Sequence, residues 1–567
     1  MSKQLQGLRT QLLVAAVAGA LGCAGFASAA VPVGGQFAVL TKATQLNRGD
    51  TVQGAMPISK SVHVTLALKL RNEAQLQMFI ANAKQPGATQ RVMSRATLAA
   101  NHLPTAAQAQ AVAAYLTKAG FKNVKIHAGN MLVSGDASAA NVQSAFQTTL
   151  INVRTQDGRN AFANNSPIKI PAALQGSVQA VLGLQTVHKA HILARPLASG
   201  TVGVQGHYPT EFADIYGASM LPAAKKVAAA VWGWGSMQNT VNDLKDFKKV
   251  TGLTIGKTNV VCTDTNGIDW NTGEGLGGTT IGDPTCNGNF DFGEVEWSMD
   301  SQSILAMSGG LKSLTFYAAY GGYNTTITDS LNEIVNPSVG EPLPQVINAS
   351  FGECERYQDA NQGGDGSLQS NDAMFQVAVA QGQTFTVSTG DSGSDECGFG
   401  NPLNSASYPA SSPWVVAVSG TTLRASNTTW ARENVWLDAG GSPSSAEMAQ
   451  PWQTNLTYGV YKGARGPDVA FDANPASGEL VLLQGSYGQI GGTSLAAPLT
   501  AGAWARILQS NPGLGFAAPH LYALPASALH DVRAGNNHGY IAKPGWDWAT
   551  GLGSFDVGKA AAALSGG

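Results

Sequence analysis

A glycine turn leads into an apolar, alanine-rich segment in the stretch Ile490-Gly491-Gly492-Thr493-Ser494-Leu495-Ala496-Ala497-Pro498. The segment after the turn is typical of a helix, so Ser494 stands where backbone N–H groups are free and the helix dipole is positive. That position suits a nucleophile whose reaction builds negative charge beside it. Because Thr and Ser are also ordinary helix caps, the turn by itself leaves a purely structural role open.

A histidine base for this serine is missing from the part of the chain that precedes it. None of the nine histidines lies between His207 and Ser494. A subtilisin-type protease needs both Asp and His upstream of its serine, so that mechanism is excluded. An α/β-hydrolase places His after Ser, and His520, His530 and His538 do follow, but the second glycine of Gly-x-Ser-x-Gly is absent. Either Ser494 is no nucleophile or its base is a carboxylate.

Two carboxylate motifs precede Ser494. Glu296 and Asp300 are spaced by four residues at the start of a segment that reads as a helix, which puts them on one face. Like charges at that spacing repel unless they share a proton, and sharing leaves a group that can take and return protons. Asp391 follows the apolar strand 384–388 in a glycine turn, and such turns carry the chemistry of α/β proteins. The alternatives are solvated surface acids and an ordinary turn aspartate.

The three motifs, Glu-x-x-x-Asp, Ser-x-Gly-Asp-x-Gly and Gly-Gly-Thr-Ser-x-x-x-Pro in this order, resemble the sedolisins, or serine-carboxyl peptidases, and most of all the pseudomonalisin-like members. The resemblance spans nearly all of the chain. It implies that Ser494 is the nucleophile, Glu296 its general base, and Asp300 the partner that orients Glu296. It also implies that Asp391, when protonated, donates a hydrogen bond to the oxyanion.

This chemistry predicts an endopeptidase that works in acid. A carboxylic acid donates to an oxyanion only while protonated, and a carboxylate base of low pKa works best near acidic pH. Charged residues make up only 12% of the chain, about half the usual share, so little charge accumulates when carboxylates protonate. The net charge of −2 speaks against a nucleic-acid binder.

The N-terminus predicts secretion. Lys3 and Arg9 precede the apolar run 12–25, and Ala27-Ser28-Ala29 fits a signal-peptidase site. Leu21-Gly22-Cys23 hints at a lipoprotein signal, but Ala20 matches that pattern poorly. We therefore expect a signal peptide at 1–29, a secreted and bacterial protein, no membrane span, and a monomer.

Four cysteines remain once Cys23 leaves with the signal: Cys262, Cys286, Cys354 and Cys397. Four cysteines allow three pairings. Zinc is the alternative, but there is no Cys-x-x-Cys pair and no histidine nearby. The sedolisin pattern favours Cys354–Cys397, bracing the Asp391 turn, which leaves Cys262–Cys286 to staple a long loop.

The chain divides into a small α+β unit, a linker and a large α/β unit. Residues 30–189 alternate strand-like and helix-like segments and resemble the sedolisin pro-domain, which implies a ferredoxin-like fold and a role as folding chaperone and inhibitor. An accessory binding domain is the alternative. Residues 190–207 are rich in small residues, as exposed linkers are, and we expect the activation cut there.

Residues 208–567 form the predicted peptidase domain. Apolar strands alternate with helices, which predicts a parallel sheet flanked by helices, and the resemblance implies the subtilisin-like fold of sedolisins. The predicted strands are 227–231, 314–318, 345–349 and 384–388, and the predicted helices 239–250, 327–335 and 372–380, with another beginning near Glu296.

The resemblance also implies substrate-binding residues. The backbone of Ser350-Phe351-Gly352 is expected to pair with an extended substrate, as in strand addition. Trp297 and Glu396 stand beside catalytic residues in sequence, and Glu396 aligns with an acidic pocket residue of some relatives. A basic residue that follows there in relatives is absent from this chain, so side-chain preference stays open.

A calcium site is predicted near the C-terminus. Two carboxylates and several turn carbonyls supply the hard oxygen ligands that Ca²⁺ takes, and sedolisins carry a structural ion at this place. The alternative is a pair of turn aspartates. The implied ligands are the carboxylates of Asp531 and Asp547 and the carbonyls of Val532, Lys543 and Gly545.

Two rival functions remain at this point. One is a catalytically inactive relative that only binds peptides or calcium. The other is an esterase in which Ser494 works with a downstream histidine.

Overall fold

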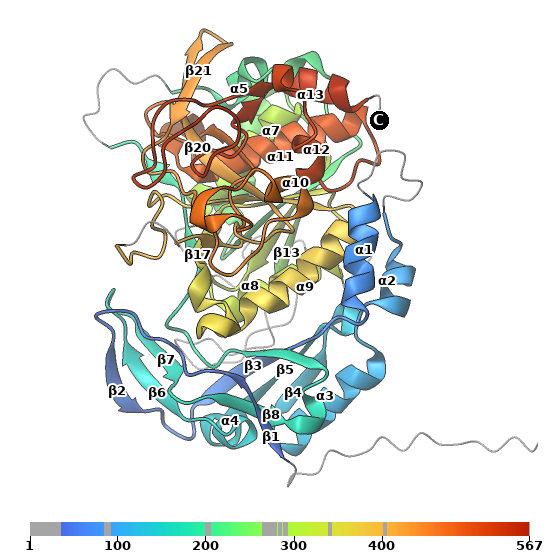
Figure 1. Ribbon diagram of the computed structural model, residues 1–567, viewed down its shortest axis with the longest axis vertical. Helices are drawn as coiled ribbons and strands as arrows, with labels where there is room; N and C mark the ends of the chain where they lie inside the picture. Colours follow the sequence, from blue (N-terminus) through green and yellow to red (C-terminus); the bar gives the residue numbers. More distant parts are fainter. Residues whose placement is uncertain are drawn as a thin grey trace, which may run out of the picture.

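The computed structural model describes residues 36–83, 92–198, 206–263, 280–281, 286, 293–337, 343–400 and 405–565. Figure 1 shows a smaller N-terminal unit, in blue to teal, below a larger unit coloured green to red. The predicted signal peptide, residues 1–29, lies outside the described residues. In the described part of the chain, no helix combines the length and the apolar character that crossing a bilayer needs.

The N-terminal unit has the predicted ferredoxin-like topology. Its four-stranded antiparallel sheet follows the order β4-β5-β3-β9, with helices inserted after the first and third of these strands in the chain. The strands are β3 (Ser61–Leu68), β4 (Lys122–Ile126), β5 (Leu132–Ser138) and β9 (Val178–Leu182), and the helices are α1 (Glu73–Ala83), α2 (Arg95–Asn101), α3 (Ala106–Lys118) and α4 (Ala139–Phe146). Smaller sheets join β1 (Phe37–Thr41) to β8 (Ile168–Pro171), and β2 (Thr51–Ala55) to β6 (Leu150–Arg154) and β7 (Asn160–Asn164).

The larger unit is built on a nine-stranded sheet of order β14-β13-β15-β12-β16-β18-β20-β21, with β22 paired to β20. Seven of these strands pair in parallel: β12, β13, β15, β16, β18, β20 and β22. The other two, β14 and β21, pair antiparallel with β13 and β20 at the ends of that order. Their bounds are β12 (Ala228–Trp234), β13 (Ile255–Thr263), β14 (Thr280–Ile281), β15 (Leu311–Ala319), β16 (Val346–Ala349), β18 (Thr384–Ser388), β20 (Val416–Ser426), β21 (Thr429–Val435) and β22 (Val469–Asp472). This confirms the predicted subtilisin-like α/β sheet.

Helices cover both faces of this sheet. Figure 1 shows α7 and α11 on one side and α8 and α9 on the other, facing the N-terminal unit. The longer helices are α6 (Gln238–Thr251), α7 (Glu294–Ser308), α8 (Asn324–Val335), α9 (Ser367–Ala380) and α11 (Thr493–Ser510), and the shorter ones are α5 (Pro209–Ile215), α10 (Pro451–Thr454), α12 (Ala518–Leu521) and α13 (Val557–Leu564).

The close approach of α7 and α11 positions the candidate site. A Cβ on Gly502 would lie 2.6 Å from Met307 Cβ and 2.9 Å from the Ile304 carbonyl, so only glycine lets the two helices touch here. From Glu296 to Ser308, α7 is buried at every position. Gln302 on this helix exchanges two hydrogen bonds with the Leu482 backbone, at 2.8 and 2.9 Å.

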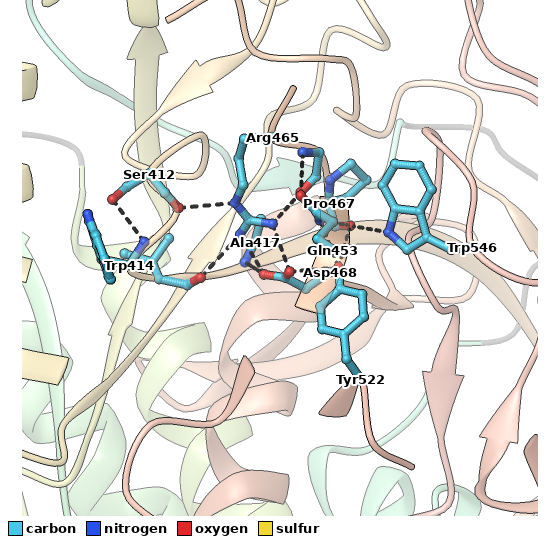
Figure 2. Close-up of polar contacts among 11 residues, drawn as sticks. Ser412, Trp414, Ala417, Gln453, Arg465, Pro467, Asp468, Tyr522 and Trp546 are labelled. Atoms are coloured by element: carbon cyan, nitrogen blue, oxygen red, sulfur yellow. Dashed lines mark hydrogen bonds and ion pairs between the residues drawn. The ribbon is translucent and has the colours of Figure 1, made fainter. Parts of the chain in front are cut away.

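A buried ion pair holds the loops beside β20 (Figure 2). Arg465 donates from Nη1 and Nη2 to the two oxygens of Asp468, at 2.7 and 2.6 Å. The same carboxylate accepts from Ala417 N at 2.8 Å and from the Tyr522 hydroxyl at 2.9 Å. Because every oxygen has two donors, the charge of Asp468 is compensated inside the protein.

Candidate active site

Ser494 is the second residue of α11 and is fully buried. Gly492 precedes the helix with φ of +108°, in the left-handed region that glycine adopts readily. The chain thereby turns abruptly from strand β24 (Ser486–Gly491) into the helix. Ser494 Oγ donates to the Ser350 carbonyl at 3.4 Å, a long bond that leaves the hydroxyl free to move to another acceptor.

Glu296 and Asp300 lie one turn apart in α7 and are both fully buried, which excludes two solvated surface acids. Burial and the neighbouring Asp300 carboxylate raise the pKa of Glu296 well above its ordinary value, and the Ser494 hydroxyl opposes the rise by hydrogen bonding. Burial also raises the pKa of Asp300. The pair therefore favours one shared proton.

A side-chain relay fixes Asp300. Ser350 Oγ donates to Asp300 Oδ1 at 2.7 Å, and Asn348 Nδ2 donates to Ser350 Oγ at 2.8 Å. Sequence reasoning assigned Ser350 a backbone role only and did not single out Asn348, although it closes the predicted strand 345–349. A polar residue at the carboxyl end of a parallel strand is the signal that could have found it.

Asp391 follows β18 and points at the turn before Ser494. Its Oδ1 accepts from the N–H and the hydroxyl of Thr493, both at 2.8 Å. Burial raises the pKa of Asp391 to about 7, although the Thr493 bonds and Arg195 oppose the rise. The carboxyl is therefore protonated in acid. Thr493 belongs to the serine motif, but the sequence alone does not indicate that it holds Asp391 through two hydrogen bonds.

Three carboxyl oxygens of the site have spare hydrogen-bonding capacity. Within the described residues, Glu296 Oε1, Asp300 Oδ2 and Asp391 Oδ2 are buried without a hydrogen-bond partner. Buried polar atoms are rarely left this way in a finished core, and such atoms are common where chemistry occurs. The arrangement thus offers a hydroxyl, a proton-accepting pair and a neutral acid that can donate.

The predicted substrate-binding residues take different positions. Phe351 and Gly352 lie in β17 (Phe351–Cys354), whose edge pairs with an extended segment of the chain itself. Glu396 accepts from Ser392 N at 2.7 Å and lies against Gly390, next to Asp391. Trp297 is fully buried, and its indole donates to the Trp234 carbonyl at 2.9 Å, so it packs in the core. Contact of Trp297 with substrate stays a prediction.

Of the predicted linker 190–207, residues 199–205 lie outside the described residues, and His191, Arg195 and Pro196 are exposed as expected, but the segment is also paired and partly buried. Two short strands, β10 (His191–Ile192) and β11 (Arg195–Pro196), pair with the larger unit, and Leu193 between them is buried. Side-chain composition predicted a solvated linker because small and polar residues dominate it. The backbone hydrogen bonds of an added strand, which composition does not report, hold it in place instead.

The histidines required by the esterase alternative are engaged elsewhere. His520 Nε2 lies 3.0 Å from the Leu514 carbonyl, and His530 stacks on Trp430 with ring centroids 4.0 Å apart. His538 is exposed, with Nε2 at 3.5 Å from Asp438 Oδ1.

Both predicted disulfides are confirmed. Cys354–Cys397 joins β17 to the loop that follows Asp391, with an S–S distance of 2.03 Å. Cys262–Cys286 joins the end of β13 to a residue 24 positions later. All four thiols are consumed, which removes the zinc alternative.

The predicted calcium ligands surround one turn. Asp547 Oδ2 accepts from Lys543 N at 2.9 Å, and Asp531 Oδ1 accepts from Gly545 N at 3.1 Å. Across the described ranges, no group of three or more His, Cys, Asp or Glu side chains could hold a metal, so an ion here would need backbone oxygens such as that of Val532 as well. Burial raises the pKa of Asp547, and a bound cation would favour the ionised form. Asp531 Oδ2 also accepts from Arg533 Nε at 2.6 Å, a bond that an ion would replace, and carboxylate and carbonyl oxygens are ligands that Ca²⁺ takes.

Comparison with known proteins agrees with the geometry. Residues 48–187 match the family "Pro-kumamolisin, activation domain", and residues 286–534 match the subtilase family. Xanthomonalisin of Xanthomonas sp. (strain T-22) is 38% identical over a region covering 89% of this chain and 66% of that protein. Sedolisin of Pseudomonas sp. (strain 101) is also 38% identical, over 89% of this chain and 87% of that protein.

A solved structure of Pseudomonas sedolisin, a serine-carboxyl proteinase complexed with two molecules of pseudo-iodotyrostatin, superposes with a TM-score of 0.55. The two proteins are 37% identical in sequence, and the matched region covers 65% of this chain and 99% of the solved one. An N-terminal activation domain, a subtilisin-like sheet and close serine-peptidase relatives occur together here, and the protein is thus a serine-type peptidase. The chain belongs to the sedolisin family of serine-carboxyl peptidases.

Proposed function

We propose that this chain is the precursor of a secreted, acid-active endopeptidase that activates itself. One observation carries the proposal: α7, α11 and the turn after β18 bring Glu296, Ser494 and Asp391 to one buried point, although the three residues are far apart in sequence. Glu296 Oε1 and Asp391 Oδ2 are buried there without hydrogen-bond partners within the described residues, and peptide hydrolysis needs a proton acceptor and an oxyanion donor at such positions.

The catalytic steps follow from the positions of these groups. Ser494 Oγ attacks the peptide carbonyl and gives its proton to Glu296, which Asp300 holds and whose charge it shares. Asp391, protonated, donates to the oxyanion of the tetrahedral intermediate. Glu296 then returns the proton to the leaving amine, an acyl-enzyme remains on Ser494, and water hydrolyses it by the same proton path.

The acid dependence has two limits. Above the pKa of Asp391, about 7, the oxyanion donor is lost as the carboxyl ionises. In strong acid, the Glu296–Asp300 pair gains its second proton and no base remains. Activity is therefore expected between these limits, on the acidic side of neutrality.

The chain organisation follows from the same proposal. Residues 1–29 direct export, the unit at 30–189 folds the peptidase and blocks it, and a cut within 190–207 releases the unit 208–567. The match of 48–187 to an activation domain supports this assignment. We also propose one structural Ca²⁺ bound by Asp531, Asp547 and backbone carbonyls of Val532, Lys543 and Gly545. The ion would supply charge compensation to the two carboxylates and hold their turn.

The test compares acidified precursor with its Ser494→Ala variant on a denatured protein substrate. The proposal expects the wild type to shed its N-terminal unit and digest the substrate, while the variant stays whole. A wild type that remains inert after both acid and removal of its N-terminal unit by another protease would show an inactive relative. Hydrolysis of esters that persists in Glu296→Gln but disappears in His520→Ala, His530→Ala or His538→Ala would show the esterase mechanism.

A further inference from the structure

The chain itself occupies the candidate active site as a bound strand. On one side of Ser494, His191 and Ile192 pair antiparallel with Gly352 and Phe351 of β17. Those are the residues whose backbone the sequence predicts to receive an extended substrate. Upstream, Ala190 N donates to the Gly322 carbonyl at 2.7 Å, so the segment that leads to His191 is also hydrogen-bonded to the larger unit.

On the other side of Ser494, the same strand pairs with β24, the strand that ends at the serine turn. Arg195 lies opposite Gly491 and Pro196 opposite Ile490, and Leu197 N donates to the Gln489 carbonyl at 3.0 Å. The Arg195 guanidinium also donates from Nη2 to the Asp391 carbonyl at 2.6 Å. The segment is therefore fixed on both flanks of the catalytic groups.

Between the two paired stretches lie Leu193 and Ala194, and the backbone N–H and carbonyl of Leu193 are at the catalytic groups. Leu193 N donates to Glu296 Oε2 at 3.1 Å, and the Leu193 side chain is buried, with 4% of its surface exposed. A Cβ built on Gly492 would lie 2.1 Å from the Leu193 carbonyl oxygen and 2.7 Å from Asp391 Oδ2. The carbonyl and Asp391 Oδ2, which also lies 3.5 Å from Arg195 Nε, thus converge on one small space.

We propose that the peptide bond between Leu193 and Ala194 is the bond that this protein cuts in itself, an inference that rests on the proposed function. Ser494 Oγ forms a bond to the Leu193 carbonyl carbon, and its proton passes to Glu296. The C–N bond to Ala194 breaks, and the Ala194 nitrogen leaves as an amine with that proton. Water then cleaves the ester on Ser494 and leaves a carboxyl group on Leu193.

Neighbouring bonds do not meet these conditions. Each adjacent bond includes a residue that is held in a paired stretch: Ile192 of β10 precedes Leu193, and Arg195 of β11 follows Ala194. The placement also assigns a preference to the mature enzyme: peptides with a large apolar residue immediately before the cut bond, because Leu193 is the residue buried at that position.

The experiment follows the purified full-length precursor after acidification by intact mass spectrometry, at several protein concentrations. The expected first products are a fragment ending at Leu193 and its complement beginning at Ala194, which appear together at a rate independent of dilution. Leu193→Lys is expected to slow their formation about tenfold or more, since a charged ammonium is costly to place where the buried Leu193 side chain lies. Leu193→Met is the matched control and is expected to keep the rate within about threefold.

A second readout separates this proposal from the proposed function. Leu193→Lys precursor, once its N-terminal unit has been removed by another protease, should digest a denatured substrate at the wild-type rate, which shows that its catalytic groups are intact. A first cut elsewhere, a rate proportional to concentration, or equal rates for Leu193→Lys and Leu193→Met would overturn the proposal while the peptidase function stands. A wild type that cleaves neither itself nor any substrate, even after its N-terminal unit is removed, would overturn both.

Discussion

The oxyanion donor gives the most direct test of the acid mechanism. Asp391 keeps its proton in acid because it is buried, and its pKa is about 7. An asparagine keeps the Thr493 contacts, because its oxygen can accept as Oδ1 now does, and it places an amide donor where Oδ2 now lies, 3.5 Å from Arg195 Nε. Unlike the acid, the amide donates at any pH. Asp391→Asn should therefore remove the alkaline limit on self-cleavage, whereas Asp391→Ala removes the donor altogether.

The magnitudes follow from the titration. With a pKa of about 7, the protonated fraction of Asp391 falls to about one tenth at pH 8 and about one hundredth at pH 9. Wild-type self-cleavage should fall by the same factors, and Asp391→Asn should stay flat over that range. Asp391→Ala should be about 10²- to 10³-fold slower than the wild type in acid, as expected for one missing oxyanion donor, and the difference should shrink above pH 7 as the wild type loses its own donor.

The assay is the first-order loss of full-length precursor in buffers from pH 4 to pH 9 at one ionic strength. Circular dichroism at each pH serves as the control that all three proteins remain folded. If Asp391→Asn loses its rate above pH 7 as steeply as the wild type, another group sets the alkaline limit and the assigned role of Asp391 is wrong.

Three further predictions concern stability and are measured on Ser494→Ala to prevent self-digestion. Arg465→Met leaves the Asp468 charge buried without its cation and should lower the free energy of unfolding by about 3–5 kcal/mol in denaturant titrations. The control is Arg424→Met, at an exposed position of β20, which should change the free energy of unfolding by less than about 0.5 kcal/mol. Equal effects of the two substitutions would refute the argument. Burial raises the pKa of three carboxyls to about 8, those of Glu353, Asp472 and Glu479. The folded state thus holds protons on these three carboxyls that the unfolded chain releases near pH 4. The stability that these protons contribute is complete below about pH 4 and is lost as the pH rises through about 8. The melting temperature should therefore fall from pH 5 to pH 9, and a rise would contradict this. Finally, EGTA should lower the melting temperature and added Ca²⁺ should restore it, whereas no response to either would remove the proposed calcium site.

Much of the fold could be predicted because its signals are local. Continuous apolar runs such as 384–388 mark strands buried on both faces, and their alternation with helical segments predicts a parallel sheet. The four-residue spacing of Glu296 and Asp300 places both on one face of α7 wherever the helix lies. Their burial, however, depends on how closely α11 packs, which Gly502 controls from a distant part of the sequence.

The features that could not be predicted depend on contacts between distant segments. The backbone pairing of His191 and Ile192 with β17 leaves no pattern in their side chains, so composition indicated an exposed linker. Asn348 bonds both Asp300 and the Ser350 hydroxyl that donates to Asp300, and no sequence motif marks it. Trp297 adjoins the general base in sequence, yet the helix turns its indole toward Trp234 and into the core.

The segment 191–196, which pairs with β17 and β24 beside the catalytic groups, determines how conversion of the precursor to the enzyme responds to dilution. A segment tethered at both ends is present at its site at an effective concentration of roughly millimolar order, whatever the volume outside. A peptide from the surroundings at micromolar concentration would be outcompeted by about a thousandfold. The timing of conversion is then an intrinsic property of each molecule, the same in a crowded compartment as in a large and nearly empty volume.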